Sequence, residues 1–183
     1  MYKKFNCICA VTALIIIGVM DSRAQTWSIS TNIPDYAAFG TFNLEGSVAV
    51  SRHISVHIGG EYNPWKIKDF QDKKITCEAG IRWWPWNIYS GWWLGTQVQY
   101  RQYNRGGLID GRAEQGDAGG LGLSAGYTLM LHKHINLEFG AGFWAGATKY
   151  EQFACTRCGK KLSEGVKGFI LPDELIMALV WTF

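Results

Sequence analysis

The sequence predicts an all-β fold: an eight-stranded antiparallel transmembrane β-barrel of the outer-membrane type. Apolar and polar residues alternate along most of the chain, a period of two that strands express and helices do not. The connections between the alternating stretches are short and long in turn, as in such barrels. With 18% charged residues, 14% aromatic residues and 22 glycines in 183 positions, the composition argues against a disordered chain, a coiled coil and a helical membrane bundle.

The first 24 residues are predicted to be a secretory signal peptide, which leaves residues 25–183 as the barrel domain. Lys3 and Lys4 precede an apolar run over 5–20, and Ala24 closes a small-x-small cleavage site. A transmembrane anchor would need about 20 uninterrupted apolar residues. Removal of the peptide leaves 15 basic and 14 acidic residues, a balance that predicts no nucleic-acid partner.

The alternation is clear from Ile54, where Val56 and Ile58 share one face and Ser55 and His57 the other. Comparable stretches recur along the whole predicted barrel domain. They predict eight strands, over residues 26–32, 41–50, 54–65, 75–86, 92–105, 120–131, 135–153 and 169–183.

The predicted connections alternate in length. Three are tight turns, at residues 51–53, 87–91 and 132–134. Four are longer and mostly polar, at residues 33–40, 66–74, 106–119 and 154–168. Because successive antiparallel strands reverse direction, all the tight turns should lie at one end of the barrel and all the long loops at the other, which is the arrangement of periplasmic turns and extracellular loops.

A soluble carrier barrel would show the same alternation, with its apolar face inside. The last strand favours the membrane alternative, because it carries apolar residues on one face and ends on Phe183, which resembles the C-terminal assembly signal of outer-membrane barrels. Aromatic residues also fall at strand ends on the apolar face, as in an interfacial girdle. The girdle at the short-turn end is predicted to contain Trp27, Trp83, Trp92, Trp181 and Phe183, with Tyr62 and Tyr100 toward the other end.

The polar face contains ionisable residues that should point into the barrel. They are Glu45, His57, Glu61, Glu78, Arg82, Arg101 and Glu138. Eight strands enclose a space that side chains can just fill. We therefore expect these residues to pair with one another, plug the lumen and leave no open pore.

Several segments resemble a known family. They are Trp27–Asn32, Tyr62–Trp65, Trp83–Trp86, Tyr89–Trp93, Tyr103–Gly107, Gly122–Tyr127 and Leu137–Gly140. With them the chain resembles a Bacteroidota family of uncharacterised outer-membrane β-barrels, a domain of unknown function, and more distantly the small OmpA-type and OmpX-type barrels. The resemblance implies the outer membrane of a Gram-negative bacterium and an association with fimbrial or envelope assembly. It brings no functional residues with it.

The sharpest local motif is Cys155-Thr156-Arg157-Cys158-Gly159. Its spacing is that of half a zinc site, but a structural zinc needs four ligands and no second pair is present. A redox role would need a helix after the first cysteine, and the segment reads as a loop. A possible disulfide between Cys155 and Cys158 is the plainer interpretation, and we expect no metal and no cofactor.

Some barrels of this size are lipid-modifying enzymes that use a histidine near the outer rim. Here His53, His132 and His134 fall in short turns and His57 in a strand, so a nucleophile at the long loops would lack a base. We expect no enzymatic activity, although such an enzyme and a soluble periplasmic carrier stay open as alternatives. The basic loops at 66–74 and 154–168 favour contact with membrane lipid and lipopolysaccharide, and the barrel is expected to be a monomer.

Overall fold

The computed structural model describes residues 27–37, 40–67, 70–106, 113–154 and 161–183. The predicted signal peptide, residues 1–24, lies outside the described residues. So do Cys155 and Cys158, the predicted disulfide pair.

Antiparallel strands form the barrel wall, and the wall closes on itself. Strand β3 pairs with β5, and β1 pairs with β9, so the ring has no break in its order. Its strands are β1 (Trp27–Asn32), β2 (Phe42–Ala49), β3 (Ile54–Asn63), β5 (Phe70–Trp83), β6 (Gly91–Gly106), β7 (Ala113–His132), β8 (Ile135–Phe153) and β9 (Lys161–Thr182). The two-residue β4 (Lys66–Ile67) pairs with β5, and the short helix α2 (Ile33–Ala37) follows β1. Over the described residues, the predicted eight-stranded antiparallel barrel is confirmed.

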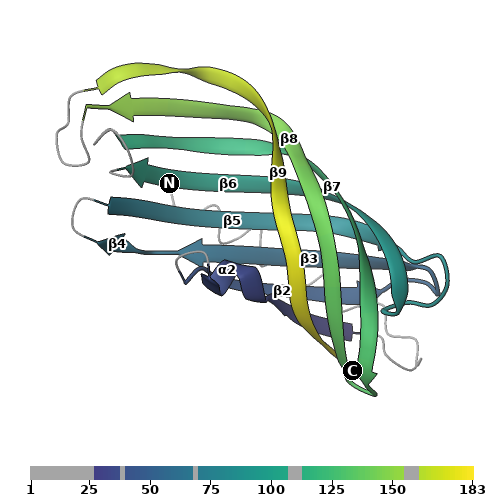
Figure 1. The fold of residues 1–183 in the computed structure, drawn as a ribbon. Coiled ribbons are helices and arrows are strands. Elements are labelled where there is room, and N and C mark those ends of the chain that lie inside the picture. Colours follow the sequence, from purple (N-terminus) through teal and green to yellow (C-terminus); the bar gives the residue numbers. More distant parts are fainter. Residues whose placement is uncertain (1–26, 38–39, 68–69, 107–112, 155–160) are drawn as a thin grey trace.

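The three tight connections, between β2 and β3, β5 and β6, and β7 and β8, lie at one end, which we call the short-turn end (Figure 1). The opposite, long-hairpin end was predicted to consist largely of loops, and this is wrong. Strand β5 begins at Phe70, β7 at Ala113 and β9 at Lys161, so much of the predicted polar loops is strand. Backbone pairing with a neighbour explains the difference: Gly116, for example, pairs with both Tyr103 and Tyr150 despite its low intrinsic strand preference.

The two faces of the wall differ sharply in chemistry. Outward positions are apolar and accessible, as at Leu123, which is 67% exposed, and Phe143, which is 64% exposed. Inward positions include Glu138 and His57, which are only 3% and 2% exposed. The alternation therefore places apolar residues outside and ionisable ones inside, the reverse of a water-soluble barrel.

Strand β9 changes face partway along its length. Phe143 pairs with Pro172 and Gly142 pairs with Glu174, so one extra residue forms a bulge between them. On the long-hairpin side of the bulge, Phe169 and Leu171 lie opposite inward positions of β8. On the short-turn side, Ile176 and Ala178 lie opposite inward positions.

Within the described part of the chain, no helix is long and apolar enough to cross a membrane.

Candidate functional site

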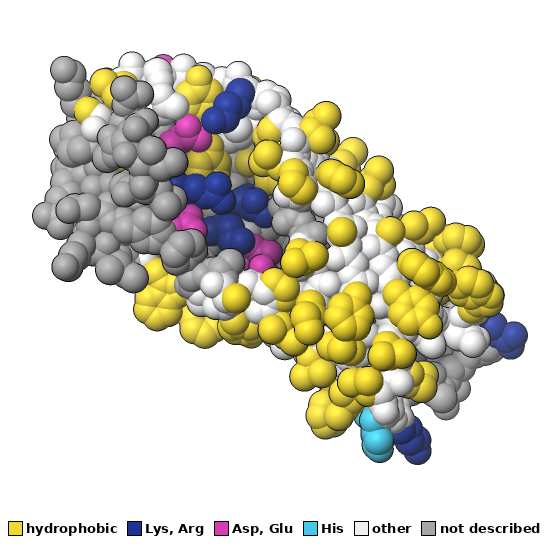
Figure 2. Space-filling model, in the orientation of Figure 1, with side chains coloured by type: hydrophobic (Ala, Val, Ile, Leu, Met, Phe, Trp, Pro, Cys, Tyr) yellow, Lys and Arg dark blue, Asp and Glu magenta, His cyan; other side chains and the backbone are white. Residues whose placement is uncertain are grey.

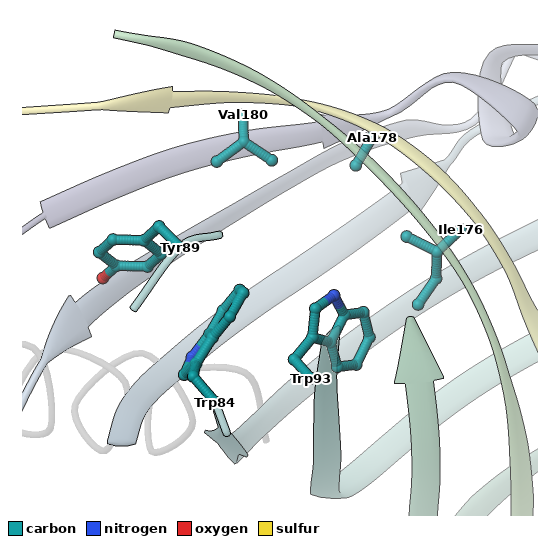
Figure 3. Close-up of a cluster of buried hydrophobic side chains, with 6 residues drawn as sticks. All are labelled: Trp84, Tyr89, Trp93, Ile176, Ala178 and Val180. Carbon is teal, nitrogen blue, oxygen red and sulfur yellow. The ribbon is translucent and has the colours of Figure 1, made fainter. Parts of the chain in front are cut away.

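The short-turn end of the lumen is filled by an aromatic plug, which we define as Trp84, Tyr89 and Trp93 (Figure 3). Strand β5 ends at Trp83, and the following turn folds Trp84 and Tyr89 back into the barrel. Trp84 Nε1 donates a hydrogen bond to Ser55 Oγ at 3.0 Å. Ile176, Ala178 and Val180 of β9 pack against the plug, so apolar side chains occupy this end of the lumen.

Tyr89 is held from two sides of the barrel. Its hydroxyl accepts a hydrogen bond from Ser47 at 3.0 Å, and its carbonyl accepts one from Asn136 Nδ2 at 3.0 Å. Its backbone φ is 58°, a conformation that costs a non-glycine residue about 1 to 3 kcal/mol. Contacts made by the side chain inside the lumen offset this strain, which links the turn to the plug.

Two glycines make room for the Trp93 indole. A Cβ on Gly126 would lie 2.6 Å from Trp93 Cζ2 and 2.4 Å from the Phe139 carbonyl oxygen. A Cβ on Gly140 would lie 3.2 Å from the same indole carbon. The glycines on this inner face therefore complement large aromatic side chains.

An ion cluster of Glu45, Arg82 and Glu138 lies against the plug. Arg82 donates hydrogen bonds to both carboxylate oxygens of Glu45, at 2.7 and 2.8 Å, and its Nη1 lies 3.6 Å from Glu138 Oε1. The Arg82 guanidinium also stacks 4.7 Å from the centroid of Trp93. Thr128 donates to Glu138 at 3.0 Å. These partners offset part of the cost of removing the three ionisable groups from water.

The other predicted lumen residues have further partners on the inner face of the wall. His57 is buried on β3, and its ring occupies the space that the missing Cβ of Gly80 leaves. Glu61 pairs with Lys74 and accepts a hydrogen bond from Thr76, while Glu78 accepts one from Gln97. Arg101 donates to Thr76 and stacks on Trp144. The seven predicted residues thus share one lumen, and within it Arg82 joins the two carboxylates Glu45 and Glu138.

Sequence reasoning missed the aromatic plug and Lys74. The sequence predicts Trp84 in a strand, Tyr89 in a tight turn and Lys74 in a loop. For Lys74 a signal exists, because it has the same parity as Thr76 and Glu78. For the inward fold of the turn, the positive φ at Tyr89 is not visible in the sequence.

The predicted girdle residues are accessible on the outer surface or partly so. Trp83, Trp92, Trp181 and Phe183 are exposed, and Trp27 is half-buried. Tyr100 lies at the opposite border of the apolar surface. Its hydroxyl donates to Asp117 at 3.0 Å and accepts from Gln102 at 3.1 Å, so its ring and its hydroxyl face different surroundings.

The lumen opens toward the long-hairpin end. Strand β1 is six residues long and pairs only with the last part of β9, Ala178–Thr182. Beyond Ala178, toward the long-hairpin end, no described strand pairs with this edge of β9. Figure 2 shows a hollow at this end, lined by basic and acidic side chains. One cavity of about 290 Å³ there contacts Arg101, Trp144, Lys167 and Phe169.

At the rim of this hollow Glu114 is held as a carboxylate. Burial raises its pKa, but hydrogen bonds from Gln152, Tyr103 and Lys167 outweigh burial and bring the pKa below the ordinary value. Lys167 Nζ lies 3.2 Å from Glu114 Oε1. Glu114 therefore stays ionised in weakly acidic solution.

The turn histidines have structural partners. His53 Nδ1 lies 2.9 Å from the Trp84 carbonyl oxygen, and His134 Nδ1 lies 3.0 Å from the Thr182 carbonyl oxygen. Because a carbonyl oxygen only accepts, each Nδ1 carries the proton. These bonds tie adjacent turns and the C-terminal strand together. Among the described residues no group of three or more His, Cys, Asp or Glu side chains could hold a metal ion.

Comparison with known proteins identifies one relationship. A family model described as a protein of unknown function, DUF3575, matches residues 10–183. No curated protein and no solved structure matches the chain.

Proposed function

Since this chain belongs to the DUF3575 family of proteins of unknown function, we propose its role from the barrel itself: a bacterial outer-membrane β-barrel without an open pore, which serves a structural or surface-interaction function in the cell envelope. The observation that carries the proposal is the inverted distribution of side chains. Large apolar residues cover the outside, and Glu45, Arg82 and Glu138 lie inside. A lipid environment stabilises this distribution, whereas water would not.

The height of the apolar surface supports this placement. Outward positions are apolar or aromatic, Thr96 excepted, from Trp92 to Tyr100 on β6 and from Ile135 to Ala147 on β8. At about 3.3 Å per residue and a tilt of about 40°, these stretches rise about 20 to 30 Å. The apolar band of outer-membrane barrels is about 25 Å tall. Beyond it, outward positions become polar at Gln102 and Lys149.

The strands that continue beyond this band supply the surface for interaction. The outward and rim side chains there are charged or polar, among them Glu114, Asp117, Lys149, Glu151 and Lys167. Lipopolysaccharide is a fitting neighbour for the lysines. The family resemblance extends the proposal to a protein partner in envelope or fimbrial assembly, which crosslinking in intact cells followed by affinity capture would identify.

Lipid-borne quenchers test the membrane placement. Fluorescent labels are attached at Leu123→Cys, outward, or Ser124→Cys, inward, in a chain whose other cysteines are replaced by alanine. In vesicles containing brominated phospholipid, we expect much stronger quenching at position 123 than at 124. Equal or reversed quenching, or recovery of the native protein in the soluble fraction of lysed cells, would overturn the proposal.

A further inference from the structure

The cavity of about 290 Å³ on the inner face of β6–β9 combines an apolar floor with a cationic border. Trp144 and Phe169 form the floor, with ring centroids 4.5 Å apart in an edge-on arrangement. Leu171 lines the same cavity and is 48% exposed. Phe169 and Leu171 face inward because of the bulge in β9, so an accessible apolar surface lies inside the barrel.

The border of this cavity is positively charged. Arg101, Arg105 and Lys167 line it, against one carboxylate, that of Glu114. The Arg101 guanidinium lies 4.7 Å from the Trp144 ring centroid, directly beside the apolar floor. Lys167 pairs with Glu114, and Arg105 pairs with Asp72 at 3.3 Å. Three cations against two carboxylates leave an excess of one positive charge, which attracts an anion.

Trp144 adds an independent feature. The side chain is only 2% exposed, and within the described part of the chain its Nε1 has no hydrogen-bond partner. A buried indole N–H normally finds an acceptor. The unsatisfied N–H therefore belongs to a side chain that lines the cavity.

The cavity is reached along the edge of β9. Strand β1 ends at Asn32, whose side chain accepts a hydrogen bond from Met177 N and donates one to Leu175 O. The short helix α2 contacts β9 next to β1, and no described strand pairs with the rest of this edge. Figure 2 shows the resulting hollow beside a surface of hydrophobic side chains.

We propose that this cavity binds one hydrocarbon chain of a single-chain amphiphile with an anionic head group, such as a fatty acid. The chain packs on Trp144, Phe169 and Leu171, and the head group lies against Arg101, Arg105 and Lys167. A volume near the lower limit of ligand pockets suits one chain segment and excludes a lipid with several chains. Only the route of entry, from the outer leaflet past β9, rests on the proposed membrane placement.

Quenching of tryptophan by dibromostearate tests the site in neutral-detergent micelles, where the membrane placement plays no part. Quenching of the exposed tryptophans should rise linearly with the mole fraction of the probe. Trp144 should add a saturable component, which unlabelled stearate reverses and Trp144→Phe removes. Leu171→Glu, at an accessible position, should abolish saturation while the protein keeps its heat-modifiable folded band.

Charge variants test the head group. Arg105→Gln and Lys167→Gln should each raise the half-saturating concentration by about fivefold, whereas Lys149→Gln, on the outward face of β8 at the same height, should leave it unchanged. The brominated alcohol of the same chain length should bind at least about tenfold more weakly. Linear quenching that is identical in the wild type and Leu171→Glu would exclude the site. Equal binding of the acid and the alcohol would exclude recognition of an anion.

Discussion

Arg82 on β5 reaches across β3 and donates a hydrogen bond to each carboxylate oxygen of Glu45 on β2. This contact joins strands that are not neighbours in the wall. The same guanidinium stacks on Trp93, so Arg82 also joins the ion cluster to the aromatic plug.

Arg82→Met should destabilise the barrel strongly, because it leaves Glu45 and Glu138 buried without their cation. Loss of one partner of a buried ion pair costs about 3 to 5 kcal/mol when burial is complete. The measurement is urea unfolding in detergent, read from the folded band on gels. Arg52→Met, at an exposed turn position, is the control and should be close to neutral. The double variant Arg82→Met with Glu45→Met should recover part of the loss, and an additive double variant would contradict a direct interaction.

The wild-type protein should form no steady porin-sized conductance steps in planar bilayers. Trp84, Tyr89 and Trp93 fill the lumen at the short-turn end, and the ion cluster lies directly against them. Joint replacement of Trp84 and Trp93 by glycine should produce measurable conductance in any protein that still folds. Large, stable steps from the wild type would show that the plug does not close the barrel.

Gly126→Ala should destabilise the barrel by about 1 to 3 kcal/mol, the usual cost of overpacking. The added methyl would lie within 2.6 Å of the Trp93 indole and within 2.4 Å of a backbone oxygen. Gly140→Ala meets the same indole at 3.2 Å and the Ala125 carbonyl oxygen at 2.7 Å. Both contacts are longer than those at Gly126, so this variant should cost less. Gly46→Ala, where nothing lies within 4 Å, is the matched control. Equal stability of all three variants would mean that Trp93 does not occupy the space described.

Ala141→Arg should cost about 2 to 4 kcal/mol in lipid vesicles, because Ala141 is the middle outward position of the apolar band from Ile135 to Ala147 and so lies near the bilayer midplane in the proposed placement. Gln115→Arg lies on the outward face of β7 beyond the apolar band and should cost much less. Equilibrium unfolding in vesicles gives both values. A similar cost at the two positions would argue against a lipid boundary between them.

The interactions of Glu114 should make stability depend on pH. A carboxylate whose pKa is lowered on folding contributes stability that is complete above its unfolded pKa and is lost as the pH falls through the folded one. Glu114→Gln should therefore lower stability at pH 7, and the difference from the wild type should fade below the ordinary pKa of 4.5. A difference that persists unchanged at the lowest pH would assign the effect to packing instead of charge.

The alternation of residues predicted the wall well, because a strand with one apolar and one polar face has only one workable register. Leu123 and Ser124 illustrate this, since the first is 67% exposed on the outer face and the second is 8% exposed on the inner face. Alternation says little about where a strand ends. Asp72 and Lys73 looked like loop residues, yet they pair with Arg105 and Asn104 on β6.

The contents of the lumen were less predictable. Ionisable residues on the polar face marked Arg82 and Glu138 as inward, but nothing in the pattern predicts which of them meet. The inward fold of Trp84 and Tyr89 depends on partners far away in sequence, such as Asn136. Such contacts depend on which residues the folded barrel brings together, and not on the conformational preference of the turn residues themselves.

Strand β9 also differs from its neighbours in its tolerance of insertion and deletion. Removing one residue from a regularly paired strand moves every side chain beyond it to the opposite face. In β9 the register slips at Pro172–Glu174, where one residue lies outside the pairing. Deletion of Asp173 would restore an unbroken alternation and keep both halves of the strand facing as they do now. Deletion of Leu179 would instead turn Phe169 and Leu171 outward. A change of length is therefore neutral at one point of β9 and disruptive at the other.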